Sequence, residues 1–469
     1  MFEFSLDEVG DIIGRKIKGA AEDVVVRRVS IDSRTVSAGD LFVGLKGARR
    51  DGAAFARDAL RKGAVASIIS HDSLKDEEDG GRIIRVKNTC AALQDIARAN
   101  RKKFGGKLIG ITGSNGKTTV KEMVASILSE EGAVIKTESN MNNHIGVPLT
   151  LLKIDGKSEF AVVEMGMNHR GEIGLLSRLA EPDIAVVLNV LRAHAGNFTD
   201  LRDIAEAKLE IAEGLKKEGT MVLNADDRLL SRTPKNIRGV LFSFGISAGS
   251  DMTAVNIKTD SCARPTFILK VRNEEREISL NLSGRHNVVN ALAAAAAAYN
   301  AGAGLDAVKK GLESVRAVKG RLDILRTGEG FIVIDDTYNA NPDSVAAALD
   351  ALREIDAKGK KIFVMGEMLE LGERARIFHR EAGAYAVKAG VTSILTVGDI
   401  AAEAGLSAIK TGLKKENVHI FDTNRSAGEF LACIIKEGDA VLLKGSRMSR
   451  VEEIFGYLNL SGVMSKESY

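Results

Sequence analysis

One stretch of ten residues, at positions 110–119, limits what this chain can fold into more than any other. It reads Gly-Ile-Thr-Gly-Ser-Asn-Gly-Lys-Thr-Thr and follows a short apolar run that is typical of a strand. After it, residues 120–128 place apolar side chains at the three- and four-residue spacing of an amphipathic helix. A strand, a glycine turn and a helix are the context that a phosphate-binding loop requires. The sequence therefore predicts an α/β domain built around a nucleotide site.

The chemistry of this loop follows from its residue types. Its glycines let successive backbone N–H groups point at one anion, and the helix start adds the positive end of its dipole. Lys117 is expected to reach the β- and γ-phosphates, and the Thr118 hydroxyl to ligate Mg²⁺. Only two residues separate Gly113 from Gly116, fewer than in the common Gly-x4-Gly-Lys-Ser/Thr loop. We interpret the loop as an ATP site formed by Gly113, Ser114, Asn115, Gly116, Lys117, Thr118 and Thr119.

Length and composition narrow the class of protein. With 469 residues the chain is too long for one core, and about three domains are expected. A net charge of +3, from 66 basic and 63 acidic residues, gives no reason to expect nucleic acid as a partner. Three scattered cysteines indicate a reducing compartment. We find no signal peptide and no apolar run long enough for a membrane span, so a soluble cytoplasmic protein is expected.

The hydrophobic pattern predicts three α/β domains. These are a small mixed α/β domain at residues 1–85, a central P-loop-type domain with a parallel sheet at 86–314, and a Rossmann-like α/β domain at 315–469. The first domain is expected to hold one helix, at 55–62. The expected strands lie at 24–26, 41–45, 65–69, 108–112, 133–137, 160–164, 184–189, 221–224, 240–244, 266–270, 276–282, 331–335, 362–365, 394–397, 419–421 and 440–443.

Three polar residues stand where ligands bind in open α/β sheets, at or just past the carboxyl ends of strands. Glu164 ends an apolar strand, His194 follows the next strand by a short loop, and Lys208 lies on a helix. A carboxylate and a neutral imidazole are able to join Thr118 and phosphate oxygens in holding Mg²⁺. Taken singly, each residue is more simply explained as a strand end, a loop histidine or helix surface.

Other polar stretches leave two interpretations open. Asn142 and Asn143 lie in an amide-rich loop that either caps a helix or holds a substrate phosphate or sugar. The turn at 32–34, Asp-Ser-Arg, is most simply a structure in which Asp32 accepts from nearby backbone N–H groups. The stretch at 444–447, Lys-Gly-Ser-Arg, is either an anion site or a glycine turn.

Together these residues resemble the Mur ligase family, the ATP-dependent amino-acid-adding enzymes of bacterial cell-wall synthesis, over essentially the whole chain. The matching landmarks are residues 32–34, 39–43, 112–119 and 284–287 with Glu164, His194, Lys208 and Arg321. Three stretches, at 142–148, 193–198 and 336–344, are most similar to the family members that take D-alanyl-D-alanine. Within the last, the loop at 337–344 is the most specific, because the sister enzyme that adds the third residue usually carries a Tyr-Ala-His-Thr-Pro type of loop there.

The resemblance implies roles for individual residues. As catalytic residues it implies Lys117, which stabilises charge on the transferred phosphoryl group, with His194 and Lys208. Thr118 and Glu164 would hold one Mg²⁺ and His194 a second, while Lys208 would be carbamoylated by CO₂ and assist metal placement. The nucleotide would also contact Asn287, Arg321, Asp336 and Asn339. The UDP end of the substrate would meet Asp32, Ser33, Arg34, Asn142 and Asn143, and Ser446 would lie near the incoming amine.

The implied substrates are ATP, UDP-N-acetylmuramoyl-tripeptide and D-alanyl-D-alanine, and the implied intermediate is an acyl phosphate. The resemblance also implies a monomer and closure of the third domain over the nucleotide. The third residue of the tripeptide, lysine or meso-diaminopimelate, stays open. One alternative is the sister ligase that adds that third residue. A more distant alternative is a P-loop switch or motor ATPase, which would hydrolyse ATP without an amine substrate. Folylpolyglutamate synthetase, a second relative, usually lacks such a first domain.

Overall fold

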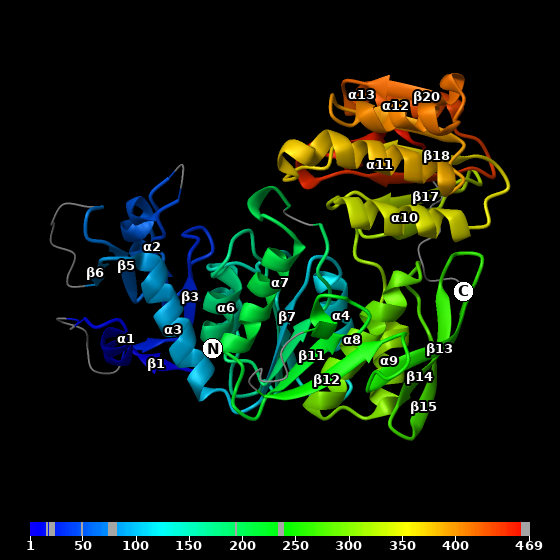
Figure 1. Cartoon of the computed structure of the whole chain (residues 1–469). Helices are drawn as coiled ribbons and strands as arrows, with labels where there is room; N and C mark the ends of the chain where they lie inside the picture. Colours follow the sequence, from blue (N-terminus) through cyan, green and yellow to red (C-terminus); the bar gives the residue numbers. More distant parts are fainter. Residues whose placement is uncertain are drawn as a thin grey trace.

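The computed structural model describes residues 1–15, 17, 24–47, 50–73, 82–192, 195–232 and 239–460. Three α/β domains follow one another along the chain, each built on its own main sheet (Figure 1). The first domain is drawn in blue at one end, the central domain in cyan and green, and the third domain in yellow to red beside it. The predicted three-domain α/β class is confirmed. Within the described residues, no helix is both long and apolar enough to cross a bilayer.

The first domain carries a four-stranded parallel sheet in the order β3-β4-β5-β6, with a separate antiparallel pair of β1 and β2. Its elements are β1 (Phe4–Ser5), α1 (Leu6–Ile12), β2 (Val25–Val26), β3 (Arg28–Ser30), β4 (Asp40–Val43), α2 (Ala56–Arg61), β5 (Ala66–Ser70) and β6 (Ile83–Val86). The expectation of one helix was wrong, because α1 is a second. Its start is fixed by a capping box in which Ser5 and Glu8 each accept from the other's backbone N–H.

The central domain is organised by a nine-stranded sheet in the order β15-β14-β13-β12-β11-β10-β7-β9-β8. Strands β7 to β13 run parallel, and β13, β14 and β15 continue the sheet as an antiparallel edge. The strands are β7 (Lys107–Thr112), β8 (Val134–Lys136), β9 (Phe160–Glu164), β10 (Ile184–Val187), β11 (Thr220–Asn224), β12 (Val240–Gly245), β13 (Met252–Thr259), β14 (Pro265–Val271) and β15 (Glu274–Ser279). The parallel part places the carboxyl ends of β7, β9 and β10 at one edge.

Helices cover both faces of this sheet. They are α3 (Thr89–Lys103), α4 (Lys117–Leu128), α5 (Gly146–Leu151), α6 (Glu172–Ala180), α7 (Leu201–Leu209), α8 (His286–Ala301) and α9 (Leu305–Ser314). On one face, α4, α8 and α9 share a core with the sheet. The alanines at 293–298 are fully buried there, as the small-residue pattern predicts for a closely packed helix. On the other face, α3, α5, α6 and α7 share a core that continues without a break into the first domain.

The third domain has a six-stranded sheet in the order β16-β17-β21-β18-β19-β20, with an apolar core on each face. Its elements are β16 (Asp323–Arg326), β17 (Ile332–Asp336), α10 (Pro342–Glu354), β18 (Lys361–Met365), α11 (Ala375–Lys388), β19 (Ser393–Val397), α12 (Ala402–Thr411), β20 (Val418–Phe421), α13 (Asn424–Ile434) and β21 (Ala440–Lys444). β17 and β21 are parallel neighbours, and Asp336 is in register with Lys444.

Most predicted strands of the second and third domains are confirmed to within one or two residues, with two omissions. β13 and β16 were missed. A bulge between Val255 and Lys258 breaks the alternation of β13, so its pattern does not read as one strand. β10 is shorter than predicted and ends at Val187. Asn189, predicted to lie in that strand, instead uses its side-chain amide to bind the backbone N–H and carbonyl of Asn115.

Candidate active site

The central and third domains enclose a cavity of about 910 Å³. The central domain contributes the nucleotide loop, the amide-rich loop and the start of α8. The third domain contributes the end of β17, the start of α10 and Lys444. The connecting segment between the two domains, including residues 315–318, also lines the cavity. The cavity therefore lies at the strand ends where the sequence predicts a ligand, and both domains form its wall.

The nucleotide loop joins β7 to α4 as predicted, and α4 begins at Lys117. Gly116 has a φ of +86°, in the left-handed region that favours glycine. A Cβ atom there would also meet the Asn290 Oδ1 atom at 2.5 Å. Glycine is therefore required at position 116, and it lets the loop turn so that the N-terminus of α4 faces the cavity.

Lys117 is half-buried in the cavity wall. Its Nζ atom donates to the carbonyl of Gly113 at 2.7 Å and to that of Ser114 at 3.3 Å. Burial lowers the pKa of the Lys117 ammonium, while the Glu164 carboxylate acts to raise it and the Arg321 charge to lower it further. A cation is thus held at the mouth of the phosphate-binding loop beside a carboxylate.

Glu164 and Thr118 are brought together, as the sequence predicts. The Thr118 hydroxyl donates to Glu164 Oε2 at 2.9 Å, and Asn142 Nδ2 donates to Glu164 Oε1 at 2.8 Å. The Glu164 side chain is buried, and its backbone N–H donates to the Thr137 hydroxyl. The donors here are a carboxylate, a hydroxyl and an amide, which are the oxygen ligands that Mg²⁺ prefers. Asn142 is a member of this cluster, a position that the sequence did not predict.

Lys208 lies on α7 and is only 2% exposed. Burial, together with the nearby positive charge of Lys117, lowers its pKa well below the usual value for lysine. It is therefore a neutral amine at a lower pH than an exposed lysine would be. His194, predicted to hold a metal, lies outside the described residues. Within the described residues, no group of three or more His, Cys, Asp and Glu side chains could hold a metal ion.

The third domain presents Asp336 and Asn339 to the cavity. Lys444, only 2% exposed, donates to Asp336 Oδ2 at 2.5 Å and to the Asn339 carbonyl at 3.0 Å. The other Asp336 oxygen accepts from the Leu322 N–H at 3.1 Å. Lys444 is neither a solvated charge nor a free anion site, the two interpretations left open by the sequence. Its pairing with Asp336 was missed, although each residue directly follows a predicted strand.

Two further predicted nucleotide residues line the same cavity. The Arg321 guanidinium lies over the Tyr338 ring, 4.2 Å from its centroid. Asn287 is buried at the start of α8, where its amide donates to the Ser283 carbonyl at 2.8 Å and accepts from Asn290 Nδ2 at 2.8 Å. Tyr338, which supports Arg321, was not predicted as a site residue.

The remaining predicted residues have mainly local partners. Asn143 lines the cavity, but its Oδ1 atom accepts from the backbone N–H groups of Ile145 and Gly146 at the start of α5. Ser446 is buried, and its hydroxyl accepts from the Leu369 N–H at 2.8 Å and lies 3.4 Å from the Ala340 carbonyl. It is not among the described residues that line the cavity.

The Asp-Ser-Arg turn lies in the first domain, away from the cavity. Asp32 Oδ1 accepts from the Arg34 N–H at 2.9 Å, which confirms the predicted turn. Hydrogen bonds from the Arg34 side chain and backbone lower the pKa of Asp32 to about 2. Lys62 donates to the Ser33 carbonyl at 2.9 Å. The turn exposes a guanidinium and a carboxylate on the surface of this domain.

Three family profiles match this chain. The Mur ligase middle domain matches residues 111–298, the glutamate ligase domain of Mur ligases matches residues 320–447, and the catalytic domain of the Mur ligase family matches residues 25–101. The range 320–447 contains the sheet of the third domain, and the range 25–101 contains the four-stranded sheet of the first domain. The range 111–298 contains Gly113–Thr119 of the nucleotide loop, Glu164 and Lys208.

Individual relatives are similar over nearly the whole chain. The UDP-N-acetylmuramoyl-tripeptide–D-alanyl-D-alanine ligase of Escherichia coli is 36% identical over 98% of this chain and 100% of its own length. A crystal structure of MurF from Acinetobacter baumannii matches with a TM-score of 0.89 and 30% identity, covering 97% of this chain and 98% of that one. A MurF ligase from Thermotoga maritima in complex with ADP matches with a TM-score of 0.82 and 30% identity, covering 93% and 98% of the two chains.

Proposed function

The chain belongs to the Mur ligase family, and we propose that it joins D-alanyl-D-alanine to UDP-N-acetylmuramoyl-tripeptide in an ATP-dependent reaction of peptidoglycan precursor synthesis. The observation that carries this proposal is the cavity in which a phosphate-binding loop of one domain faces polar residues of the next. Relatives that match this chain from end to end carry the name of the dipeptide-adding ligase, which favours it over the ligase that adds the third residue. Because the chain belongs to a ligase family, the alternative of a P-loop switch or motor ATPase is set aside.

The reaction requires activation of a carboxylate, because a carboxylate is too poor an electrophile to form an amide directly. The terminal carboxylate of the tripeptide attacks the γ-phosphorus of ATP, which gives an acyl phosphate and ADP. The amine of the dipeptide then attacks the acyl carbon, and phosphate leaves with its bonding electron pair as the amide forms. The amine also releases a proton. The protein contributes positioning and charge neutralisation to both steps.

Lys117 is the residue we assign to the transferred phosphoryl group. Its ammonium lies within the loop that faces the cavity and is held there by two loop carbonyls. A cation at this position neutralises charge that develops on the phosphoryl oxygens. We assign Gly113, Ser114, Asn115, Gly116, Thr118 and Thr119 to the nucleotide phosphates, with Asn287, Arg321 and Asn339 on the rest of the nucleotide.

Mg²⁺ fits the donor set at the end of β9. Thr118 and Glu164 would hold it together with phosphate oxygens and water, and His194 is proposed as a ligand of a second ion. When bound, the metal neutralises phosphate charge. Asn142 orients the carboxylate by donating to its second oxygen. Contacts at both of its oxygens thus fix the orientation of the Glu164 carboxylate.

Lys208 is proposed to carry a carbamate. Its neutral amine is the form that attacks CO₂, giving a carbamate anion and releasing one proton to water. Burial and the Lys117 charge favour the neutral form. The product would place an anionic oxygen group beside Lys117, where it would assist metal placement.

Asp336 is proposed to bind the ribose of ATP, and Lys444 to hold its carboxylate in place. We expect Lys444→Met to raise the KM for ATP about tenfold, because the Asp336 carboxylate, whose side chain is 16% exposed, loses its buried ion-pair partner. The preference for ATP over 2′-deoxy-ATP should fall as well. Steady-state kinetics with both nucleotides measure these effects. Lys410→Met, at an exposed lysine of α12, is the control and should leave the KM for ATP within about twofold. An unchanged nucleotide preference in Lys444→Met would contradict the assignment.

The roles of the remaining predicted residues are proposed from the family resemblance. We propose that Asp32, Ser33, Arg34, Asn142 and Asn143 contact the UDP-linked substrate, and that Ser446 lies near the incoming amine. The domain limits proposed are 1–85, 86–314 and 315–469. A monomer in the cytoplasm, where ATP is available, completes the proposal.

A phosphate-release assay tests the function directly. Pi release from ATP should require both the UDP-tripeptide and D-alanyl-D-alanine, and mass spectrometry should find the pentapeptide product. The matched arm replaces the dipeptide by lysine or meso-diaminopimelate and the tripeptide by the UDP-dipeptide. Incorporation of a single diamino acid, or Pi release without either acceptor, would refute the proposed function.

A further inference from the structure

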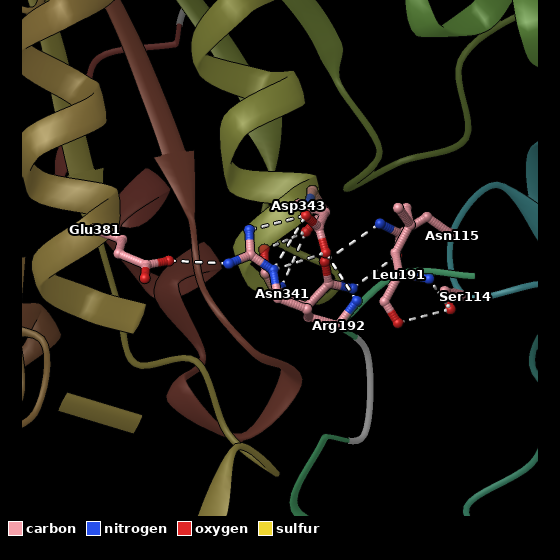
Figure 2. A network of polar contacts seen from close by, with 8 residues as sticks. Ser114, Asn115, Leu191, Arg192, Asn341, Asp343 and Glu381 are labelled. Atoms are coloured by element: carbon pink, nitrogen blue, oxygen red, sulfur yellow. Dashed lines mark hydrogen bonds and ion pairs between the residues drawn. The ribbon is translucent and has the colours of Figure 1, made fainter. Parts of the chain in front are cut away.

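A loop of the central domain is anchored to the third domain through Arg192. This residue follows β10, and its guanidinium forms hydrogen bonds and an ion pair with Asp343 in the first turn of α10, with Arg192 Nη2 to Asp343 Oδ1 at 3.0 Å. Its backbone N–H also donates to Asp343, at 2.8 Å. Arg192 Nη1 reaches Glu381 of α11 at 2.9 Å, and the guanidinium lies 5.3 Å from the Phe378 ring centroid. Figure 2 shows Arg192 between Asp343 and Glu381.

The same loop is bound to the nucleotide loop. The Ser114 hydroxyl accepts from the Leu191 N–H at 2.9 Å and donates to the Leu191 carbonyl at 3.1 Å. The side chain of Asn189, in the same loop, binds the backbone N–H and carbonyl of Asn115. Arg192 directly follows Leu191 in the sequence. The residue that contacts the third domain is therefore the immediate neighbour of the residue that contacts the nucleotide loop (Figure 2).

A second connection is direct. The side-chain amides of Asn115, in the nucleotide loop, and Asn341, at the start of α10, form two reciprocal hydrogen bonds of 2.7 and 3.2 Å (Figure 2). Both residues line the cavity. Asn341 also caps α10, because its Oδ1 atom accepts from the Ser344 N–H at 2.9 Å. Further along the loop, the Gly196 N–H donates to the Glu370 carbonyl at 3.0 Å.

We propose that Asn341 and Asp343 are positioning residues for ATP: they hold the nucleotide loop, through Asn115 and through Arg192 with Leu191 and Ser114, in its nucleotide-binding arrangement. The start of α10 thereby sets the affinity of a phosphate site that belongs to another domain. The inference rests on the proposed function only for the identity of the nucleotide. Neither residue is assigned to the reacting groups.

Of the two carboxylates that pair with Arg192, Asp343 makes more contacts and is less exposed than Glu381. Asp343 is contacted by the backbone and the guanidinium of Arg192 and is three-quarters buried, whereas Glu381 is contacted by one guanidinium nitrogen and its side chain is 52% exposed. Exposed ion pairs contribute little, because water and salt screen them. Removal of the Asp343 charge should therefore matter, and removal of the Glu381 charge should not.

Asn341→Ser, Asp343→Asn and Glu381→Gln test the proposal. Serine retains the cap of α10 but is too short to reach Asn115. Asparagine at 343 keeps the shape and an acceptor oxygen but abolishes the ion pair. Glu381→Gln is the matched control, since it removes the other carboxylate that pairs with Arg192. For each variant, isothermal titration calorimetry measures the Kd of a non-hydrolysable ATP analogue with Mg²⁺, thermal unfolding gives Tm, and steady-state kinetics give kcat and each KM.

We expect Asn341→Ser and Asp343→Asn each to weaken binding of the ATP analogue about tenfold and to raise the KM for ATP similarly. The KM for D-alanyl-D-alanine and the Tm should stay close to wild type, and Glu381→Gln should change the Kd by less than about twofold. An unchanged Kd in both variants would overturn the proposal. So would an equal loss in Glu381→Gln, or a rise in both KM values together with a lowered Tm. Binding of the analogue needs no acceptor, so it remains measurable even if the proposed acceptor is wrong.

Discussion

Lys117→Met is expected to lower kcat/KM for ATP about 1,000-fold. Methionine keeps most of the apolar stem but carries no charge. The transferred phosphoryl group would then develop charge beside the Glu164 carboxylate without the cation that the loop holds there. Pi release with saturating UDP-tripeptide and dipeptide measures the loss, and thermal unfolding checks that the variant folds.

Lys121→Met is the matched control for Lys117. Lys121 lies one turn further along α4, is buried, and donates to the Thr137 carbonyl at 2.8 Å. Its removal should lower Tm, because the Thr137 carbonyl loses its donor and Glu122 loses one of its two ion pairs, the other being with Lys136. It should leave the KM for ATP within about threefold. Comparable loss of activity in both variants would mean that Lys117 acts through the stability of α4 and not through charge at the cavity.

Lys208→Ala should reduce ligase activity at least about 100-fold. Alanine provides no amine for CO₂, and the anionic group proposed beside Lys117 cannot form. Added bicarbonate should leave the variant inactive. In the wild type, carbon-13-labelled bicarbonate should give a carbamate signal by nuclear magnetic resonance, and this signal should be absent from Lys208→Ala.

Lys208→Arg separates charge from chemistry. Arginine retains a long cationic side chain but does not become a neutral amine, because its pKa is too high. It should be as inactive as Lys208→Ala. Full activity in either variant, or a carbamate signal that persists in Lys208→Ala, would remove the carbamate from the mechanism.

The sequence predicts the fold well where a strand is an unbroken apolar run. The parallel strands of the central and third domains lie close to their predicted positions because both faces of these strands are buried and the strands are continuous apolar runs. Prediction failed at β13, where a bulge breaks the period, and at α1, which is two turns long. The capping box at Ser5 and Glu8 was a usable signal for α1.

In the candidate site, some contacts were predicted from the sequence and others were not. Thr118 and Glu164 were predicted to meet, because the loop after one strand and the end of its neighbour lie at the same sheet edge, and they do. The contacts of Asn115 with Asn341 and of Arg192 with Asp343 were beyond prediction, because they join residues more than 100 positions apart in the sequence that belong to different domains. The partner of Lys444 was within reach, since strands β17 and β21 both end in a charged residue.

The wall of the cavity includes the segment that joins the central and third domains. This arrangement limits how the protein can be divided or recombined. A cut within residues 315–318 would separate the phosphate-binding loop from Asp336 and Lys444 and would also break the wall itself, so neither fragment would inherit a complete site. Grafting the central domain onto another protein would transfer a glycine loop but not an ATP-dependent ligase. The candidate active site requires the central domain, the third domain and the segment that joins them, so the two domains have to be kept together.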